Sequence, residues 1–265
     1  MVREFENKDL WALILGGSSG LGLATAQKLA SHGLNICIVH RNRKSEMSTV
    51  EMEFENIRKE GVSFLAFNAD ACKEEEQEAI VEALKSTLGK TGRIHVLVHS
   101  LAKGNLKPMV SADQLTLKRD DFRLTIEAMA ITLYDWTKLL FDRNLFAADA
   151  RISSFTSEGN TRAWANYAAV SAAKTALEAI TRNIALEFAP FGIKANCIQA
   201  GITDTASFRA IPGSKELRLH SLNRNPMKRL TTPKDVADVV YLLCKKEAAW
   251  INGSIIPVDG GEHLR

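Results

Sequence analysis

The feature of this sequence that most constrains its fold is the alternation of short apolar runs with longer helical patterns. Several of the runs are apolar nearly throughout, as is typical of strands buried on both faces. The candidate helices lie near 20–32, 44–60, 73–88, 119–144, 164–189 and 233–245. The candidate strands are Leu10–Leu15, Asn35–Val39, Val62–Phe67, Ile94–Val98, Arg151–Phe155, Ile193–Ile198 and Ser254–Val258. This alternation predicts an α/β fold, a doubly wound parallel sheet of about seven strands with helices on both faces.

Composition excludes several other classes of protein. The 265 residues are 46% hydrophobic and 25% charged, which fits one globular domain over residues 1–265. A net charge of +3 is too small to predict nucleic-acid binding. The four scattered cysteines form no CxxC pair, so we expect no metal site and reduced thiols in a cytoplasmic protein. No apolar segment is long enough to predict a membrane span or a secretion signal.

A glycine-rich turn follows the first predicted strand and precedes the first predicted helix. Its pattern is GxxxGxG, not the commoner GxGxxG of dinucleotide sites. Glycines permit a tight turn and a close approach to a pyrophosphate, and the helix N-terminus supplies N–H donors. A plain β–α turn is the alternative, but the position favours a cofactor site in a Rossmann-type domain. The residues expected to bind the cofactor are Gly16, Ser18, Ser19, Gly20, Leu21 and Gly22.

Over nearly its whole length the chain resembles the short-chain dehydrogenase/reductase family. The turn GGSSGLG fits that family, with Leu15 where threonine is frequent. Asn196–Thr205 resembles its N-A-x-x-P-G-x-x-x-T element, although Ala200 replaces the proline, and Ile256–Gly261 matches its usual last strand. The resemblance implies an oxidoreductase that uses a nicotinamide cofactor. It also implies cofactor contacts at Gly201, Ile202, Thr203 and Thr205.

The end of the fourth predicted strand carries a more specific resemblance. It has the sequence His99-Ser100-Leu101-Ala102, where the wider family usually has N-N-A-G. An H-S-[IL]-A sequence resembles the enoyl reductases of the family. Backbone at the carboxyl end of a parallel strand can hold the nicotinamide half of a cofactor. We therefore expect Ser100, Leu101 and Ala102 to bind the cofactor and His99 to be structural.

The residues after the second predicted strand bear on the choice of cofactor. An acidic residue there would bind the adenosine ribose, but the chain has Arg41-Asn42-Arg43. Arg41 and Arg43 could bind a 2′-phosphate through charge-assisted hydrogen bonds, so the sequence favours NADPH. A solvated basic start of the next helix is the alternative. Asp70 and Ala71, after the third strand, stand where the family often places an acid near the adenine, although a surface turn could also carry this aspartate.

Tyr167 and Lys174 are the candidate catalytic pair. Their spacing of seven resembles the divergent branch of the family, Y-x-x-[MV]-x-x-x-K, most of whose members are enoyl-acyl carrier protein reductases. Seven helical residues return to nearly the same face after a rise of about 10.5 Å, so both side chains can address one site. The resemblance implies that Lys174 binds the nicotinamide ribose. The positive charge of Lys174 would also favour a Tyr167 hydroxyl that donates a hydrogen bond to the substrate. An exposed lysine and a tyrosine at a helix start are the alternative.

Ser154 points toward a different substrate. It lies thirteen residues before Tyr167, where the wider family keeps a serine that holds a carbonyl oxygen, with Ser153 and Ser157 as competitors. One branch of enoyl reductases has a second tyrosine ten positions before the catalytic one, and here that position is Ser157. The asparagine that many carbonyl reductases use is absent, with Glu127 near its place.

Residues 201–231 form a predicted substrate loop, in which we expect at most one short helix. Residues 206–230 contain six cations and one acid, Glu216. Such a patch could attract an acidic acyl carrier protein or the phosphates of coenzyme A. A solvated lid or a subunit contact is the alternative. The six cations are Arg209, Lys215, Arg218, Arg224, Lys228 and Arg229.

These observations predict an NADPH-dependent reductase of a 2-enoyl thioester, as in fatty-acid biosynthesis. The alternatives are a carbonyl reductase acting on a 3-ketoacyl group or small ketone, a biosynthetic enzyme for another small molecule, and a non-enzymatic nucleotide sensor. The family commonly pairs the helices at 119–144 and 164–189 across two-fold axes, so we expect a homodimer or homotetramer.

Overall fold

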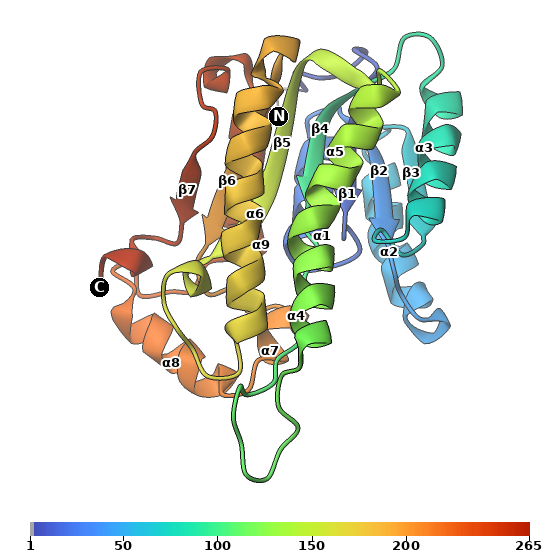
Figure 1. The fold of residues 1–265 in the computed structure, drawn as a ribbon. Coiled ribbons are helices and arrows are strands. Elements are labelled where there is room, and N and C mark those ends of the chain that lie inside the picture. Colours follow the sequence, from blue (N-terminus) through green and yellow to red (C-terminus); the bar gives the residue numbers. More distant parts are fainter. Residues whose placement is uncertain (1–2) are drawn as a thin grey trace.

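The computed structural model describes residues 3–265 and confirms the predicted doubly wound sheet (Figure 1). Every strand pair is parallel, and the order is β3-β2-β1-β4-β5-β6-β7. The chain builds outward from β1 to β3 and then returns to β4, so the carboxyl ends of β1 and β4 flank a topological switch point. The strands are β1 Leu10–Leu15, β2 Asn35–His40, β3 Phe64–Asn68, β4 Arg93–His99, β5 Phe146–Ser157, β6 Ile193–Ala200 and β7 Ile255–Val258.

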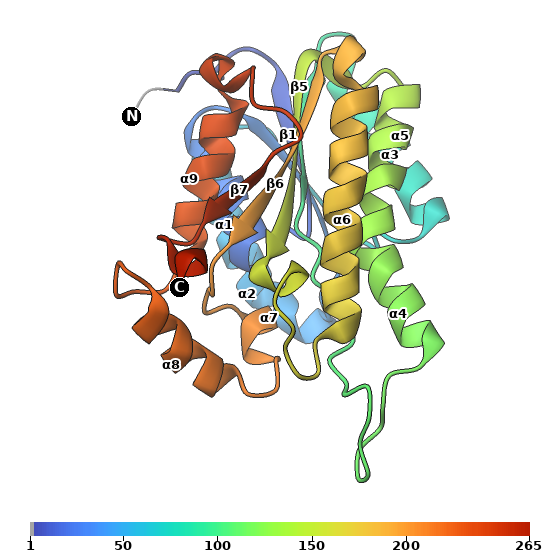
Figure 2. The ribbon, with the colours of Figure 1, turned by 60° about the vertical axis from the view of Figure 1, so that its left-hand side comes forward.

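Helices cover both faces of the sheet (Figures 1 and 2). On β1, Leu13 and Leu15 pack into one apolar layer, and Ala12 and Ile14 pack into the other. The first layer includes α3 (Glu74–Leu88), α5 (Thr132–Asp142) and α6 (Ala168–Glu187); the second includes α1 (Gly20–Ser31), α2 (Met47–Arg58) and α9 (Pro233–Cys244). None of the helices in residues 3–265 combines the length and apolarity that crossing a lipid bilayer requires.

Two predicted helices differ from the structure at points that matter for the site. The segment 119–144 is divided into α4 (Arg119–Ile126), a π-helical turn Glu127–Ile131, and α5. The last long helix before β6 begins at Ala168 rather than near 164, which makes Tyr167 its N-cap with non-helical backbone. The π-helical turn and the N-cap both lie beside the cavity described below, where irregular backbone aims side chains that a regular helix would not.

The predicted substrate loop is more ordered than its sequence suggests. It contains two helices, α7 (Ala206–Arg209) and α8 (Ser214–Arg224), and a parallel bridge between Thr203 and Thr231 joins its ends. Figure 2 shows α7 and α8 at the carboxyl edge of the sheet. Ser221 is the one buried residue of α8, so this helix gains little stability from apolar packing.

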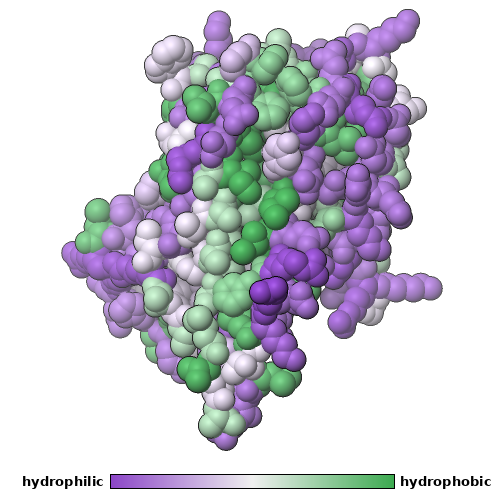
Figure 3. All heavy atoms as spheres, viewed as in Figure 1, coloured by the Kyte–Doolittle hydropathy of each residue, from purple (hydrophilic) through white to green (hydrophobic). Residues whose placement is uncertain are grey.

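We propose that α4, α5 and α6 form a contact between copies of this chain. Leu124, Tyr134 and Leu186 are 48%, 45% and 74% exposed, and Figure 3 shows a band of apolar side chains over α5 and α6. We expect light scattering to give a mass greater than one chain. Replacing Tyr134 and Leu186 together by Glu should return the mass to that of one chain, because the contact would bury two unpaired charges.

The matched control for this experiment is Leu242→Glu. Leu242 is 54% exposed on α9, on the opposite face of the sheet, and its replacement should leave the mass unchanged. A wild-type protein that is monomeric at micromolar concentration would contradict the proposal.

Candidate active site

A cavity of about 480 Å³ opens at the carboxyl edge of the sheet. It extends from the β1–α1 turn, past the ends of the neighbouring strands, to the first turns of α6 and to α7. Of the predicted site residues, Gly22, Arg43 and Ser154 do not line it. Those that do are Gly16, Ser18, Ser19, Gly20, Leu21, Arg41, Asn42, Asp70, Ala71, Ser100, Leu101, Ala102, Tyr167, Lys174, Gly201, Ile202, Thr203 and Thr205.

The glycine turn is held by close backbone contacts. Gly16 has φ +85°, and a Cβ there would lie 2.5 Å from the Ser100 carbonyl oxygen. A Cβ on Gly22 would lie 2.2 Å from the Gly16 carbonyl oxygen, so Gly22 seats α1 against the turn without facing the cavity. The Ser19 side chain makes no capping hydrogen bond to α1. The turn therefore presents a helix N-terminus with uncapped N–H groups, which fits a pyrophosphate.

Charged residues surround the end of the cavity near β2 and β3. The Arg41 guanidinium forms an ion pair with Asp70, and Lys103 Nζ lies 3.5 Å from the same carboxylate. Burial opposes the ionisation of Asp70, but the Cys72 N–H and these two cations together lower its pKa. Lys103 also lines the cavity and had been given no role from the sequence, although it directly follows Ala102.

Arg43 stands apart from this group. Its backbone N–H donates to the Glu46 carboxylate at 3.0 Å, and its side chain is not part of the cavity wall. The Asn42 amide donates to the same carboxylate at 3.1 Å. The prediction that Arg41 and Arg43 act together therefore fits the structure at Arg41 alone.

Tyr167 lies between a serine and an apolar wall. Its hydroxyl is 3.5 Å from Ser157 Oγ, and its ring centroid is 5.4 Å from that of Trp164. Burial raises the pKa of Tyr167, so the phenol is a proton-bearing donor at neutral pH. The apolar side chains that pack around it are Ala128, Met129, Val170, Leu106, Trp164 and Ile211.

Lys174 lies deeper, on the same helix. Its Nζ donates to the Phe155 carbonyl oxygen at 2.5 Å, and the residue is 8% exposed. Burial lowers the pKa of Lys174 to about 8. The ammonium is therefore placed at the end of β5, where it faces the cavity and can lose its charge just above neutral pH.

The role predicted for Ser154 is not supported by its position. Its hydroxyl is fully buried and lies 3.0 Å from Thr181 Oγ1 and 2.8 Å from Cys197 Sγ. The strand β5 runs to Ser157, two residues beyond its predicted end, so Ser154 lies inside the sheet. Ser157, named from the sequence as a competitor, is the serine beside Tyr167.

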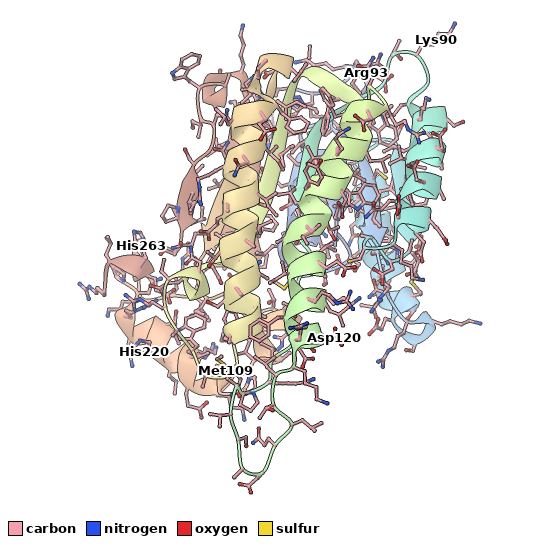
Figure 4. All side chains as sticks on the ribbon, in the orientation of Figure 1. Lys90, Arg93, Met109, Asp120, His220 and His263 are labelled. Atoms are coloured by element: carbon pink, nitrogen blue, oxygen red, sulfur yellow. The ribbon has the colours of Figure 1, made fainter. Side chains whose placement is uncertain are left out.

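A cluster of ion pairs attaches α8 to the cavity wall. Arg224 pairs with Glu158, which follows β5, and with Glu262 near the C-terminus at 2.9 Å. Ser221 Oγ donates to Glu262 at 2.6 Å. Figure 4 shows His220 of α8 and His263 of the C-terminal turn on the same side of the molecule. We call Arg224, Glu158 and Glu262 the α8 latch; sequence reasoning missed both glutamates, which line the cavity.

The α8 latch shows that the predicted basic patch is less charged at the surface than expected. The Arg224 side chain is 9% exposed and neutralised by two carboxylates, so it cannot meet an external partner. Arg209 and Arg229 are paired with Asp204 and Asp235. The surface charge of the segment is therefore smaller than the count of six cations implies.

Replacing Arg224 by Met should release α8, because it removes the counter-charge of Glu262 and the ion pair that joins α8 to Glu158, which keeps only its pair with Arg162. Breaking such a buried pair costs about 3–5 kcal/mol, which α8 cannot offset by apolar packing. Amide exchange across 206–230 should become markedly faster. Arg218→Met, at an exposed position of the same helix, is the control and should change nothing. Unchanged exchange in Arg224→Met would show that other contacts hold the helix.

Comparison with known proteins agrees with this geometry. A family model described as enoyl-(acyl carrier protein) reductase matches residues 16–263. The chain is 26% identical over 257 residues to peroxisomal 2,4-dienoyl-CoA reductase of Danio rerio, covering 97% of this chain and 82% of that protein. It is 28% identical over 254 residues to 3-oxoacyl-[acyl-carrier-protein] reductase MabA of Mycobacterium tuberculosis, covering 94% and 91%.

A solved structure agrees as well. The short-chain dehydrogenase from Burkholderia cenocepacia J2315, in complex with NADP, superimposes with a TM-score of 0.81 at 25% identity and covers 97% of this chain and 98% of that one. The cavity, the glycine turn and the Tyr167–Lys174 pair thus occur in a chain matched along nearly all of its length. The protein belongs to the short-chain dehydrogenase/reductase family of oxidoreductases, in the group described as enoyl-(acyl carrier protein) reductase.

Proposed function

We propose that this protein reduces the 2,3 double bond of a 2-enoyl thioester with NADPH. The observation that carries the proposal is the Tyr167 hydroxyl, buried against an apolar wall at one end of a cavity whose other end fits a dinucleotide. An acyl chain would pack on Met129, Trp164 and Ile211, with its thioester oxygen within reach of the phenol. The strand-end sequence His99–Ala102 and the spacing of seven between Tyr167 and Lys174 support the same reaction.

The cavity residues fit the proposed cofactor. The β1–α1 turn would bind the pyrophosphate, Arg41 and Asn42 the 2′-phosphate, and Lys174 the nicotinamide ribose. NADPH would supply the hydride for the reduction. The structure of Burkholderia cenocepacia short-chain dehydrogenase in complex with NADP supports the choice of a phosphorylated cofactor.

Tyr167 would act on the oxygen where negative charge develops during the reaction. A hydrogen bond from the buried phenol to the thioester oxygen strengthens as that oxygen becomes enolate-like. The Lys174 ammonium, held by the Phe155 carbonyl, adds positive potential to the same region. Apolar neighbours exclude water from the phenol, which makes its hydrogen bond more effective than in solution.

A second candidate is carbonyl reduction, and the Ser157 hydroxyl supports it. Ser157 Oγ and the Tyr167 hydroxyl are 3.5 Å apart, so the two groups could hold one carbonyl oxygen between them. The similarity to MabA, a 3-oxoacyl-[acyl-carrier-protein] reductase, points to the same alternative. Both candidates use an acyl thioester and differ in which double bond is reduced.

The thioester carrier is proposed from charge. Lys215, Arg218 and Lys228 are exposed cations of the segment that covers the cavity, and could attract an acidic acyl carrier protein. The four free thiols fit the cytoplasmic location that the sequence suggests.

Tyr167→Phe tests the catalytic assignment. It removes one hydroxyl, so cofactor affinity should change little, while turnover of an enoyl thioester should fall by roughly 10²–10³, the scale of losing one oxyanion donor. Steady-state kinetics with matched enoyl and 3-ketoacyl thioesters measure this. If turnover stays intact on both, Tyr167 is not catalytic.

Ser157→Ala separates the two candidate reactions. A carbonyl reductase should lose much of its turnover, because Ser157 would hold the reacting oxygen. An enoyl reductase should lose little, since Tyr167 can bind the thioester oxygen alone. Ser154→Ala is the control for a buried hydroxyl and should affect stability more than the ratio of the two activities.

Arg41→Ala tests the cofactor assignment. The NADPH dissociation constant should rise about tenfold or more, the scale of one charge-assisted hydrogen bond, while NADH affinity should change little. Arg43→Ala, which lies outside the cavity wall, is the comparison and should have a smaller effect. Titration by fluorescence measures both constants. Equal losses for NADPH and NADH in Arg41→Ala would refute a contact with the 2′-phosphate.

A further inference from the structure

Glu178 is a buried acid beneath the active site with no role in the reaction described above. It is 6% exposed, lies on α6 four residues after Lys174, and does not line the cavity. Residues four apart on a helix share a face, with Cβ atoms about 6 Å apart. A carboxylate in this position costs free energy unless nearby donors or a cation compensate its charge.

The donors come from the end of β5 and the turn that follows. Thr156 Oγ1 donates to Glu178 Oε1 at 2.5 Å, and Asn160 Nδ2 donates to the same oxygen at 2.6 Å. Thr156 stands between Phe155, whose carbonyl accepts from Lys174, and Ser157, which lies beside Tyr167. Glu178 is therefore hydrogen-bonded, through two side chains, to the segment that contacts Lys174 and lies beside Tyr167.

The titratable groups near Lys174 show which of them can affect the charge of its ammonium. Three titratable groups face Lys174 from the surrounding elements: His99 of β4, Cys197 of β6 and Glu178 of α6. Burial and the nearby lysine hold the pKa of His99 at about 3, and burial raises the pKa of Cys197. His99 and Cys197 are therefore neutral at pH 7, and Glu178 is the one carboxyl group of the three.

We propose that Glu178 is a positioning residue for the reaction, which keeps the buried Lys174 ammonium charged and anchors the end of β5 that holds it. This rests on the proposed role of Lys174 in binding the cofactor ribose. Burial already brings the pKa of Lys174 to about 8. Without the neighbouring carboxylate, the lysine would lose its proton near the pH of the cell, and with it the charge that binds the cofactor.

The test replaces Glu178 by Gln, which keeps the shape and an acceptor for Thr156 but removes the charge. Lysine side chains labelled with carbon-13 and nitrogen-15 report the Lys174 titration in the free protein, with its signal identified by its loss in Lys174→Arg. We expect the Lys174 midpoint to fall by about one pH unit in Glu178→Gln. NADPH affinity should then decline from a correspondingly lower pH, because a neutral lysine cannot contribute its charge.

Glu187→Gln, at an exposed position of the same helix, is the matched control and should leave the midpoint in place. A folded Glu178→Gln protein that titrates at the wild-type pH would overturn the proposal. If that variant does not fold, Glu178→Asp carries the test: its charge is withdrawn by one methylene, so a smaller fall is expected, and an unchanged midpoint overturns the proposal. The titration needs neither cofactor nor substrate. A wild-type protein that binds no NADPH would therefore refute the proposed function and leave the Lys174 measurement intact.

Discussion

Two backbone hydrogen bonds beyond the ends of the central strands fix the loops at the cofactor end of the candidate active site. The Gly16 N–H donates to the Val39 carbonyl, and the Ser100 N–H donates to the Leu15 carbonyl, both at 2.8 Å. They extend the ladder across β2, β1 and β4 into the loops where the cofactor would bind. The turn is therefore continuous with the sheet, and its shape is set by the same hydrogen bonds that set the strand register. Glycine at 16 and 22 is the sequence requirement of this arrangement, because either Cβ would strike a carbonyl oxygen.

The opposite half of the cavity depends on side-chain charges rather than on backbone. Lys174 donates to a main-chain carbonyl, Glu178 accepts from one residue at the end of β5 and one in the turn after it, and Arg224 joins α8 to Glu158 and Glu262. Each of these groups is largely removed from water, where a charge without a hydrogen-bonded partner is costly. This half of the candidate site is thus stabilised by a small number of specific contacts, and losing one of them leaves a poorly compensated charge away from water.

Sequence reasoning predicted the features that depend on local pattern. The alternation of strand and helix patterns predicted the seven strands, because buried strands and amphipathic helices have different periodicities. The glycine-rich composition of the β1–α1 turn predicted the position of the cofactor site at the switch point. The position of Ser154 differs from the expectation because the sequence pattern does not define where a strand ends. The strand β5 continues for two residues beyond Phe155, so Ser154 lies within the sheet and Ser157 lies beside Tyr167. Arg224 was counted as a surface cation because a charge run does not reveal which member is buried. Its partners, Glu158 and Glu262, are 66 and 38 residues away in the chain.

Relatives that match this chain to a similar degree are named for different reactions. The peroxisomal 2,4-dienoyl-CoA reductase and the 3-oxoacyl-[acyl-carrier-protein] reductase match this chain about equally well. A glycine turn at the end of a parallel strand is a requirement of dinucleotide binding, whatever the second substrate. Substrate choice would instead depend on a few side chains beyond the sheet edge, such as Ser157, Trp164 and Ile211. A change from one reducible bond to another can then occur at positions that neither the fold nor the cofactor site constrains.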